Sequence, residues 1–455
     1  MPADAGPAAG PPDAADAGLD TVPDAAGPDT GPDLDAVVSP RTGIVTHVMP
    51  FVSELLPRAM VTRLALTARP ELLPGVAADF SVMGFGVGTS AAEARVGAVG
   101  ETLERYGSLV GGALVPVERG SYRDLGADAV PGDAFALPSR ATPSSCVPWD
   151  ETAPRGWVEG HDLTRDRRVW VPAQLALPCY RARFDGEDLS PWTTTGLAAH
   201  TDPEAAVLAG LREVEERDAF TIRHLNRWTP PEIPLFGVAD DVDALLASLP
   251  RWLDLEVRAW DLTLDLGQPV VLAGVLPNHP DLPPFCFGAS CRGDYPSALR
   301  KAVLEAFQIV AVMARRGFPA TATAEPLEEL ADPEDHIRMT CQPGYRDSLR
   351  WLLHERVPWR PPGGRAPARE TTLAEAVEAV ARRGMRVISV DLTPPDLREL
   401  GWHVVKTLVP GSQPLSFGRL QCLGGERLYR LPVELGHRRE PARESELNPA
   451  PHPFA

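Results

Sequence analysis

Lysine is almost absent from this 455-residue chain, which contains only Lys301 and Lys406. Arginine supplies nearly all the positive charge, and this bias, with abundant alanine and proline, indicates a GC-rich genome rather than a function. Acidic residues outnumber basic ones, and the net charge is −18. No basic excess exists to release counterions from a phosphate backbone, so we expect no nucleic-acid partner.

Several other sequence features are missing. The six cysteines include no Cys-x-x-Cys pair, and Cys286 with Cys291 lacks the second pair that a zinc site needs. No apolar run is long enough to span a bilayer, and the N-terminus lacks the basic-then-apolar order of a signal peptide. No phosphate-binding Gly-x-x-x-x-Gly-Lys-Ser/Thr loop occurs. We therefore expect a cytoplasmic protein with reduced thiols and no membrane contact.

Composition divides the chain into three parts. Residues 1–40 are rich in Ala, Gly, Pro and Asp and contain no Lys or Arg, which predicts a disordered acidic tail. Residues 41–440 show no long linker and are expected to form one domain. Residues 441–455 end with proline at every second position, at Pro449, Pro451 and Pro453, followed by Phe454 and Ala455. This spacing predicts a stiff, extended end.

The middle part alternates strand-like and helix-like patterns, which predicts a mixed α/β fold. Apolar residues at helical spacing predict helices around Val96–Leu103, Val207–Val214 and Leu299–Val310. Ser90 with Glu93 predicts a capping box, and Asp202 before Pro203 predicts another helix start. The strand-like runs are 168–171, 255–260, 270–276, 385–390 and 403–408.

Two of these helices carry the same motif, Glu-x-x-Glu-Arg, after an Ala- and Gly-rich stretch. The first copy is Glu101-Thr-Leu-Glu104-Arg105, and the second is Glu213-Val-Glu-Glu216-Arg217. Carboxylates three residues apart share a helix face. If the two faces met, they would gather four carboxylates, and Mg²⁺ with a polyphosphate would match such a site.

Each of these residues also has a simpler interpretation. Arg105 and Arg217 could be helix-surface partners of Glu101 and Glu213 at i, i+4. Glu93 could be only a helix cap. In the third helix, where Glu305 and Gln308 are three residues apart, Gln308 could be a surface amide.

The combination of motifs resembles the YcaO family. Three segments carry the resemblance, from Gly86 to Tyr106, from Thr195 to Ala219 and from Ser297 to Gln308, in the family's order. The segment from Val405 to Gly418 is similar to the family's C-terminal region. The closing Pro-x-Pro-x-Pro resembles the branch that forms azoles, the thiazole/oxazole-modified peptide cyclodehydratases.

The resemblance implies a YcaO-like ATP-binding fold with helices packed on mixed sheets, and ATP and Mg²⁺ as cofactors. The Mg²⁺ ligands that it implies are Glu101, Glu104, Glu213 and Glu216. The nucleotide contacts that it implies are Glu93, Arg217, Lys301 and Glu305. It also implies that the tail folds towards the active site, where the catalytic contribution would come from Pro449, Pro451, Pro453 and the terminal carboxylate of Ala455.

The reaction implied is ATP-dependent cyclodehydration. A Cys, Ser or Thr side chain of a ribosomal precursor peptide attacks the preceding amide, the amide oxygen is phosphorylated, and loss of phosphate leaves a thiazoline or oxazoline. Nothing before Arg41 has the character of a leader-recognition domain, so we expect a separate partner with that role, ThiF-like or similar. The resemblance also raises a dehydrogenase partner and a homodimer as expectations.

The chain departs from the family pattern at four positions. Gly97 replaces the usual Ser, Thr195 the usual Asn, Ala205 an acid and Lys301 an Arg. A lysine does not reproduce the bidentate fork of a guanidinium. These departures leave two alternatives open: a thioamide- or amidine-forming enzyme of the same family, and a non-catalytic scaffold that binds the peptide or an active partner.

Overall fold

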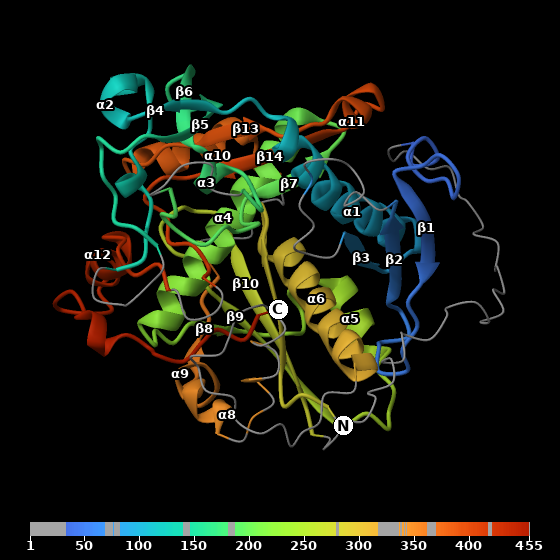
Figure 1. The fold of residues 1–455 in the computed structure, drawn as a ribbon. Coiled ribbons are helices and arrows are strands. Elements are labelled where there is room, and N and C mark those ends of the chain that lie inside the picture. Colours follow the sequence, from blue (N-terminus) through green and yellow to red (C-terminus); the bar gives the residue numbers. More distant parts are fainter. Residues whose placement is uncertain are drawn as a thin grey trace, which may run out of the picture. The chain divides into compact units, whose positions relative to one another are not determined.

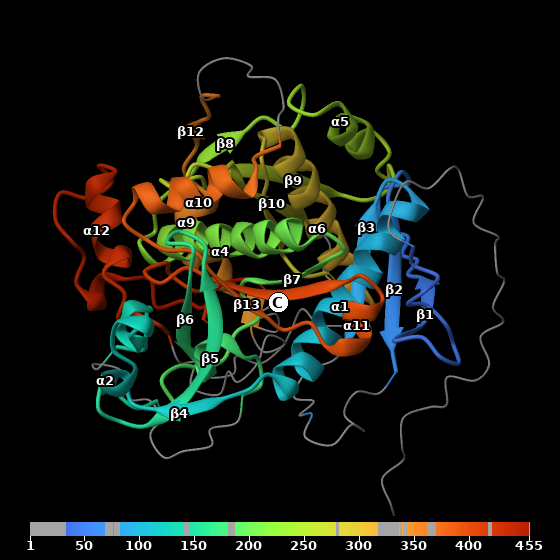
Figure 2. The same ribbon diagram turned by 90° about the horizontal axis from the view of Figure 1, so that it is seen from above.

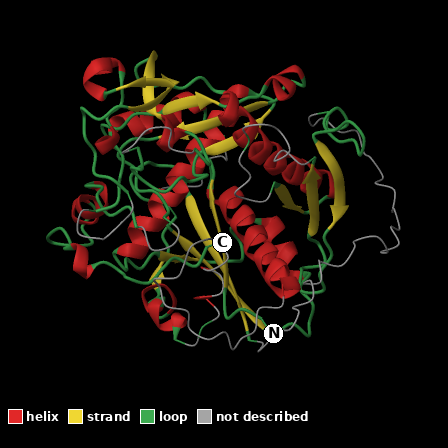
Figure 3. Cartoon of the chain, in the orientation of Figure 1, coloured by secondary structure: helices red, strands yellow, loops and turns green. Residues whose placement is uncertain are grey.

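The structure, a computed structural model, describes residues 33–68, 76, 82–139, 146–180, 187–278, 282–316, 336, 339–340, 342, 344–361, 370–416 and 421–454. These residues form three β-sheets with helices packed against them (Figure 1). Figure 3 shows helices and strands interspersed throughout. The mixed α/β class expected from the sequence is thus confirmed.

The first sheet is antiparallel and carries the first motif helix, α1 (Ala91–Leu114). Its strands are β1 (Val45–Pro50), β2 (Val61–Thr67) and β3 (Met83–Gly88). Helix α1 packs directly on β3. A Cβ atom at Gly86 of β3 would lie 1.8 Å from the Ala94 carbonyl oxygen, so only glycine permits this approach.

In the second sheet, the strands β10 (Val270–Pro277) and β11 (Cys286–Cys291) are buried on both faces. The other strands of this sheet are β8 (Pro231–Ile233), β9 (Leu255–Asp261) and β12 (Val357–Pro358). Successive residues of a strand point to opposite faces. Val271, Ala273 and Val275 therefore pack in the core with helix α6 (Tyr295–Arg316), whereas Leu272 packs on the other side with Phe220.

The third sheet packs against the second motif helix, α4 (Pro203–Leu225). Its strands are β4 (Glu118–Gly120), β5 (Arg155–Asp162), β6 (Arg167–Pro172), β7 (Leu197–His200), β13 (Ile388–Asp391) and β14 (His403–Leu408). Helix α4 also contacts β10 and β11, so it lies between the second and third sheets. Strand β13 begins three residues later than the sequence pattern predicts.

The remaining α-helices are shorter than α1, α4 and α6. They are α2 (Tyr122–Leu125), α3 (Ala173–Ala176), α5 (Asp240–Ala247), α8 (Tyr345–Ser348), α9 (Arg350–Leu353), α10 (Leu373–Arg382), α11 (Pro395–Glu399) and α12 (Arg427–Glu434). Figure 2 shows α10 lying alongside α4. None of the helices in the described part of the chain combines the length and apolar character that crossing a membrane requires.

Two local expectations need correction. Leu34 and Val37 are buried and Val38 forms a bridge with Val45, so packed structure begins before the boundary expected at residue 40. These three apolar residues stand at the end of an otherwise acidic segment. The rest of the predicted tail, residues 1–32, lies outside the described residues.

The capping box predicted at Ser90 is only half formed. The Ser90 hydroxyl accepts from the Glu93 N–H, but the Glu93 carboxylate accepts from the Thr89 N–H instead of the Ser90 N–H. The start predicted at Asp202 is confirmed, because its carboxylate accepts from two N–H groups of the first turn of α4, with Pro203 as the first helical residue.

Candidate functional site

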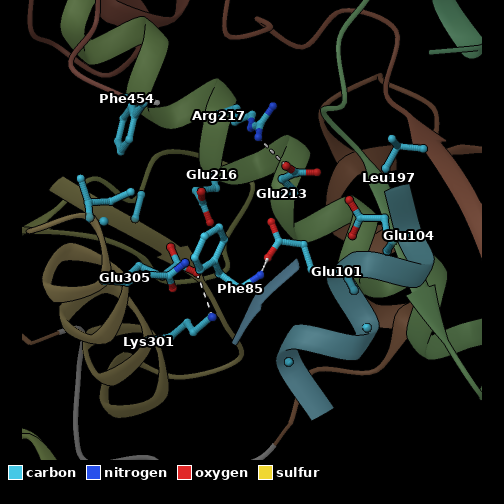
Figure 4. Close-up of a pocket in the computed structure, with 18 of the residues that line it drawn as sticks. Phe85, Glu101, Glu104, Leu197, Glu213, Glu216, Arg217, Lys301, Glu305 and Phe454 are labelled. Carbon is cyan, nitrogen blue, oxygen red and sulfur yellow. Dashed lines mark hydrogen bonds and ion pairs between the residues drawn. The ribbon is translucent and has the colours of Figure 1, made fainter. Parts of the chain in front are cut away.

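The two motif helices face one cavity of about 640 Å³. Helix α6, strands β3, β7 and β11 and the end of the C-terminal tail also contribute to its lining. Figure 4 shows the side chains of Glu101, Glu104, Glu213, Glu216 and Glu305 gathered there. The convergence of the two Glu-x-x-Glu faces, on which the sequence interpretation depends, is present in the fold.

The first glutamate of the α1 motif is fixed by two contacts. Glu101 accepts a hydrogen bond from the Phe85 N–H on β3, with N and Oε2 2.7 Å apart. Its other oxygen pairs with Arg105 at 2.6 Å, one helical turn along. The helix-surface pairing considered for Arg105 is therefore present, and it orients the Glu101 carboxylate within the cavity lining.

The first glutamate of the α4 motif repeats this arrangement. Glu213 accepts from the Gly196 N–H at 2.7 Å and pairs with Arg217 at 2.6 Å. Gly196 has φ of +87°, which disfavours any side chain, and a Cβ there would lie 2.0 Å from the Thr407 carbonyl oxygen. Arg217 also donates to the Thr195 hydroxyl at 2.7 Å, so the threonine at this departure from the family pattern has a defined contact.

The second glutamate of each motif is the more strongly perturbed. Burial, then the charges of Glu213 and Glu101, raises the pKa of Glu104 well above its usual range. Burial, then the charges of Glu305 and Glu213, raises the pKa of Glu216 to about 8. Because each carboxylate is influenced by the next, the five glutamates named above form one continuous acidic row across three helices.

The third helix contributes a carboxylate that is already paired. Lys301 and Glu305, four residues apart on α6, form an ion pair at 3.0 Å. Gln308 also lines the cavity, which favours a role for it beyond that of a surface amide. The backbone N–H of Cys291, at the end of β11, donates to Glu216 at 3.2 Å.

The acidic row fits Mg²⁺ bound together with a polyphosphate. Mg²⁺ prefers one or two carboxylates per ion, with substrate phosphates and water completing its octahedron. Within the described residues, no group of three or more His, Cys, Asp or Glu side chains is arranged to hold one ion by itself. A cation whose coordination is completed by phosphate needs no such cage, and its charge would offset the burial and the repulsion that raise both pKa values.

Glu93 does not belong to the acidic row. It is not among the residues that line the cavity. Arg300 of α6 binds both of its carboxylate oxygens, and this contact ties the start of α1 to α6. The nucleotide contact predicted for Glu93 stays a prediction. The contact with Arg300 gives Glu93 a structural role beside helix capping.

The C-terminal tail runs into the same cavity. Pro453 and Phe454 line it, and the Phe454 ring packs edge-on against Phe220, with centroids 4.5 Å apart. Pro451 is buried, whereas Pro449 is exposed, so the three prolines are not equivalent. Ala455 lies outside the described residues.

Three carbonyl groups of the tail are held by side chains from elsewhere. His224 of α4 contacts the Ala450 oxygen at 2.8 Å, Tyr345 donates to the Pro451 oxygen at 2.5 Å, and His336 contacts the His452 oxygen at 3.2 Å. We name these three side chains the tail clamp. Their contacts hold the tail backbone and thereby fix the position of Phe454.

His452 itself is used structurally. Its Nε2–H donates to the backbone carbonyl oxygen of Ser416, and its Nδ1 accepts from the Phe454 N–H. Burial, followed by the charges of His336 and His224, lowers its pKa well below the usual range. The ring is therefore neutral, and both nitrogens are committed to the tail conformation.

Sequence patterns did not mark two cations, one in the cavity lining and one near it. Arg292 lines the cavity from the loop after β11, where no periodicity marks it. Lys406 of β14 does not line the cavity but is buried next to the α4 motif, and burial lowers its pKa to about 7.

Comparison with known proteins assigns the family. A model of the YcaO cyclodehydratases, described as ATP- and Mg²⁺-binding, matches residues 85–413. The chain belongs to the YcaO family. The match includes the three central helices and both glutamate motifs. It confirms the family expected from the sequence, together with ATP and Mg²⁺ as its cofactors.

Solved structures share this fold. A heterocyclase in complex with substrate and cofactor superposes with a TM-score of 0.68 at 22% identity, over 92% of this chain and 56% of that one. YcaO from Methanopyrus kandleri, bound with AMPPCP and Mg²⁺, gives 0.56 at 24% identity, over 88% and 90% of the two chains. The E. coli microcin synthetase McbBCD complex gives 0.55 at 16% identity, over 81% and 88%.

A relative with a similar sequence has no characterized activity. An uncharacterized protein of Methanothermobacter thermautotrophicus is 27% identical over 354 residues, covering 73% of this chain and 82% of that protein. The present YcaO chain spans little more than half the length of the heterocyclase that it matches. Family and fold are therefore assigned, whereas the reaction, the substrate and the partners are not.

Proposed function

We propose that this YcaO protein is the ATP-dependent cyclodehydratase component that converts Cys, Ser or Thr of a ribosomal precursor peptide into thiazoline or oxazoline. The observation that carries the proposal is the meeting of the acidic row with Pro453 and Phe454, at the end of the Pro-x-Pro-x-Pro tail, in one cavity. The tail is a feature of the azole-forming branch, and its burial beside the glutamates favours that branch over thioamide or amidine formation.

The chemistry asks for positioning and charge neutralisation more than for a protein nucleophile. When bound, ATP and Mg²⁺ supply an activated phosphoryl group for the amide oxygen. The Phe85 and Gly196 N–H groups hold Glu101 and Glu213 in fixed orientations, so that less reorganisation is needed as a cation binds. Pro453 and Phe454 line the cavity and add apolar surface to it.

The four departures from the family pattern support the scaffold alternative only weakly. Gly97 and Lys301 line the cavity, whereas Thr195 and Ala205 do not. The Ala205 N–H caps onto Asp202 in the first turn of α4. None of the four removes a member of the acidic row.

Two kinds of partner accompany the proposal. The substrate is a precursor peptide, and a separate leader-recognising protein presents it. The similarity to the McbBCD complex supports a multi-component arrangement. A dehydrogenase that oxidises the ring, and a homodimer, remain predictions from the resemblance.

A reconstitution tests the function. The protein, Mg-ATP, a candidate leader-recognising partner and a Cys/Ser/Thr-rich precursor encoded nearby are incubated together. We expect phosphate release and the loss of one water from the peptide per ring formed. Replacement of oxygen by sulfur without water loss would indicate a thioamide-forming enzyme, and peptide binding without phosphate release would indicate a scaffold.

A further inference from the structure

Four side chains with a fixed positive charge line the cavity in the described part of the chain: Arg105, Arg217, Arg292 and Lys301. Three of them are paired with a glutamate of the acidic row on their own helix, four residues away. An incoming anion must share these cations with a carboxylate. Arg292 differs from the other three in this respect.

Arg292 lies in the loop between β11 and α6, where no acidic residue shares a helix face with it. Its Nη1 donates to the Cys291 carbonyl oxygen at 2.7 Å. Within the described residues, no carboxylate lies within ion-pair distance of its guanidinium. Most of its five N–H donors are therefore available to a ligand.

The backbone that carries Arg292 is firmly held. Its N–H donates to the Pro269 carbonyl oxygen at 3.1 Å. The neighbouring Gly293 packs so closely that a Cβ there would lie 3.0 Å from the Thr371 nitrogen. On the other side, the Cys291 N–H donates to Glu216. The backbone that carries the guanidinium is thus fixed directly beside the acidic row.

We propose that Arg292 is an anion-binding residue that takes the β- or γ-phosphate group of the nucleoside triphosphate. This inference rests on the proposed function and deepens it, because it names the contact that the phosphate makes with the protein itself. A guanidinium presents parallel N–H donors that match two oxygens of one phosphate group. The N–H of the adjacent Cys291 binds Glu216, so Arg292 follows directly on a residue that contacts the acidic row. A cation bound at the row and the phosphate on Arg292 would thus be neighbours.

Equilibrium binding tests this role without turnover. Calorimetric titrations with AMPPCP and with AMP, both with Mg²⁺, would compare the wild type with R292M and R292K. Arg123, which pairs with Glu151 outside the cavity, supplies the matched control R123M. A lost charge-assisted contact should weaken AMPPCP binding by about tenfold to a hundredfold in R292M. R292K should fall between R292M and the wild type, while AMP binding and R123M stay unchanged.

The possible outcomes distinguish a failure of the Arg292 site from a failure of the proposed function. If the wild type binds AMPPCP and R292M binds it equally well, the Arg292 site is wrong and the proposed function stands. Equal losses for AMP and AMPPCP would also overturn the site, since they would indicate a general distortion. A wild type that binds no AMPPCP refutes the function and the site together. Should R292M not fold, as judged by circular dichroism, the conservative R292K carries the same test.

Discussion

At the scale of single residues, the ionisation of Glu216 opposes folding in the absence of a cation. The buried environment and the charges of Glu305 and Glu213 raise its pKa from 4.5 to about 8. Between those two values the folded state holds a proton that the unfolded state has lost. Stability from this group is therefore complete below the lower value and falls as the pH rises towards the upper one.

The variant E216Q should reveal this effect. Without metal, it should be as stable as the wild type near the lower pKa and more stable by on the order of a few kcal/mol at about pH 8. The shifts at His224 and His452 are common to both proteins and cancel. Urea unfolding across this pH range measures the difference, and E434Q on the exposed part of α12 is the control. A pH-independent difference would contradict the electrostatic account.

The repeated motif predicted that four carboxylates of the acidic row would meet, whereas Glu305 was expected from the family resemblance as a nucleotide contact. The sequence did not predict Arg292, which lies in a short loop, or the tail clamp. His224 and Tyr345 act on backbone carbonyls more than a hundred residues away in the chain, and such contacts leave no local pattern.

At the scale of elements, α1 and α4 repeat one arrangement. Each follows a strand or turn whose backbone N–H binds the first glutamate of the motif, and each glutamate pairs with an arginine one turn later. Strands β9, β10 and β14 match the sequence patterns within one residue. Strand β13 begins late because the turn after α10 includes Gly384 at φ +75° and residues 385–387 pass outside the strand.

The tail is an element whose contribution can be separated from folding. Deletion of Pro449 to Ala455 should slow cyclisation by about tenfold or more, because Pro453 and Phe454 no longer line the cavity. Circular dichroism should remain unchanged. The single variants P453A and P449A refine the test, since Pro453 lines the cavity and Pro449 is exposed. Equal rates for the deletion and the wild type would remove the tail from the proposed site.

At the scale of the whole site, the acidic row is assembled from helices packed on different sheets. Helix α1 lies on the first sheet, α6 on the second, and α4 between the second and third. The sequence showed the mixed α/β class and the family, but the meeting of these helices depends on contacts between segments distant in the chain. A cation with nucleotide bound at the row should therefore strengthen contacts among all three.

Ligand removal tests this coupling. Mg²⁺ with AMPPCP should raise the midpoint of thermal unfolding, by an amount equivalent to about 2.7 kcal/mol when the ligand is at a hundred times its dissociation constant. Addition of EDTA should return the midpoint to that of the free protein. Differential scanning calorimetry follows both steps. A nucleotide-induced shift that survives EDTA would mean that the nucleotide binds without the metal.

The most direct test of the central claim is Mn²⁺ binding, followed by electron paramagnetic resonance, in the presence of AMPPCP. The account predicts that the wild type binds Mn²⁺ only when the nucleotide is present or binds it far more tightly then, and that E104A and E216A each lose this binding while remaining folded. If both variants retain wild-type Mn²⁺ binding, the acidic row is not a metal and nucleotide site, and the proposed reaction has no basis in this cavity.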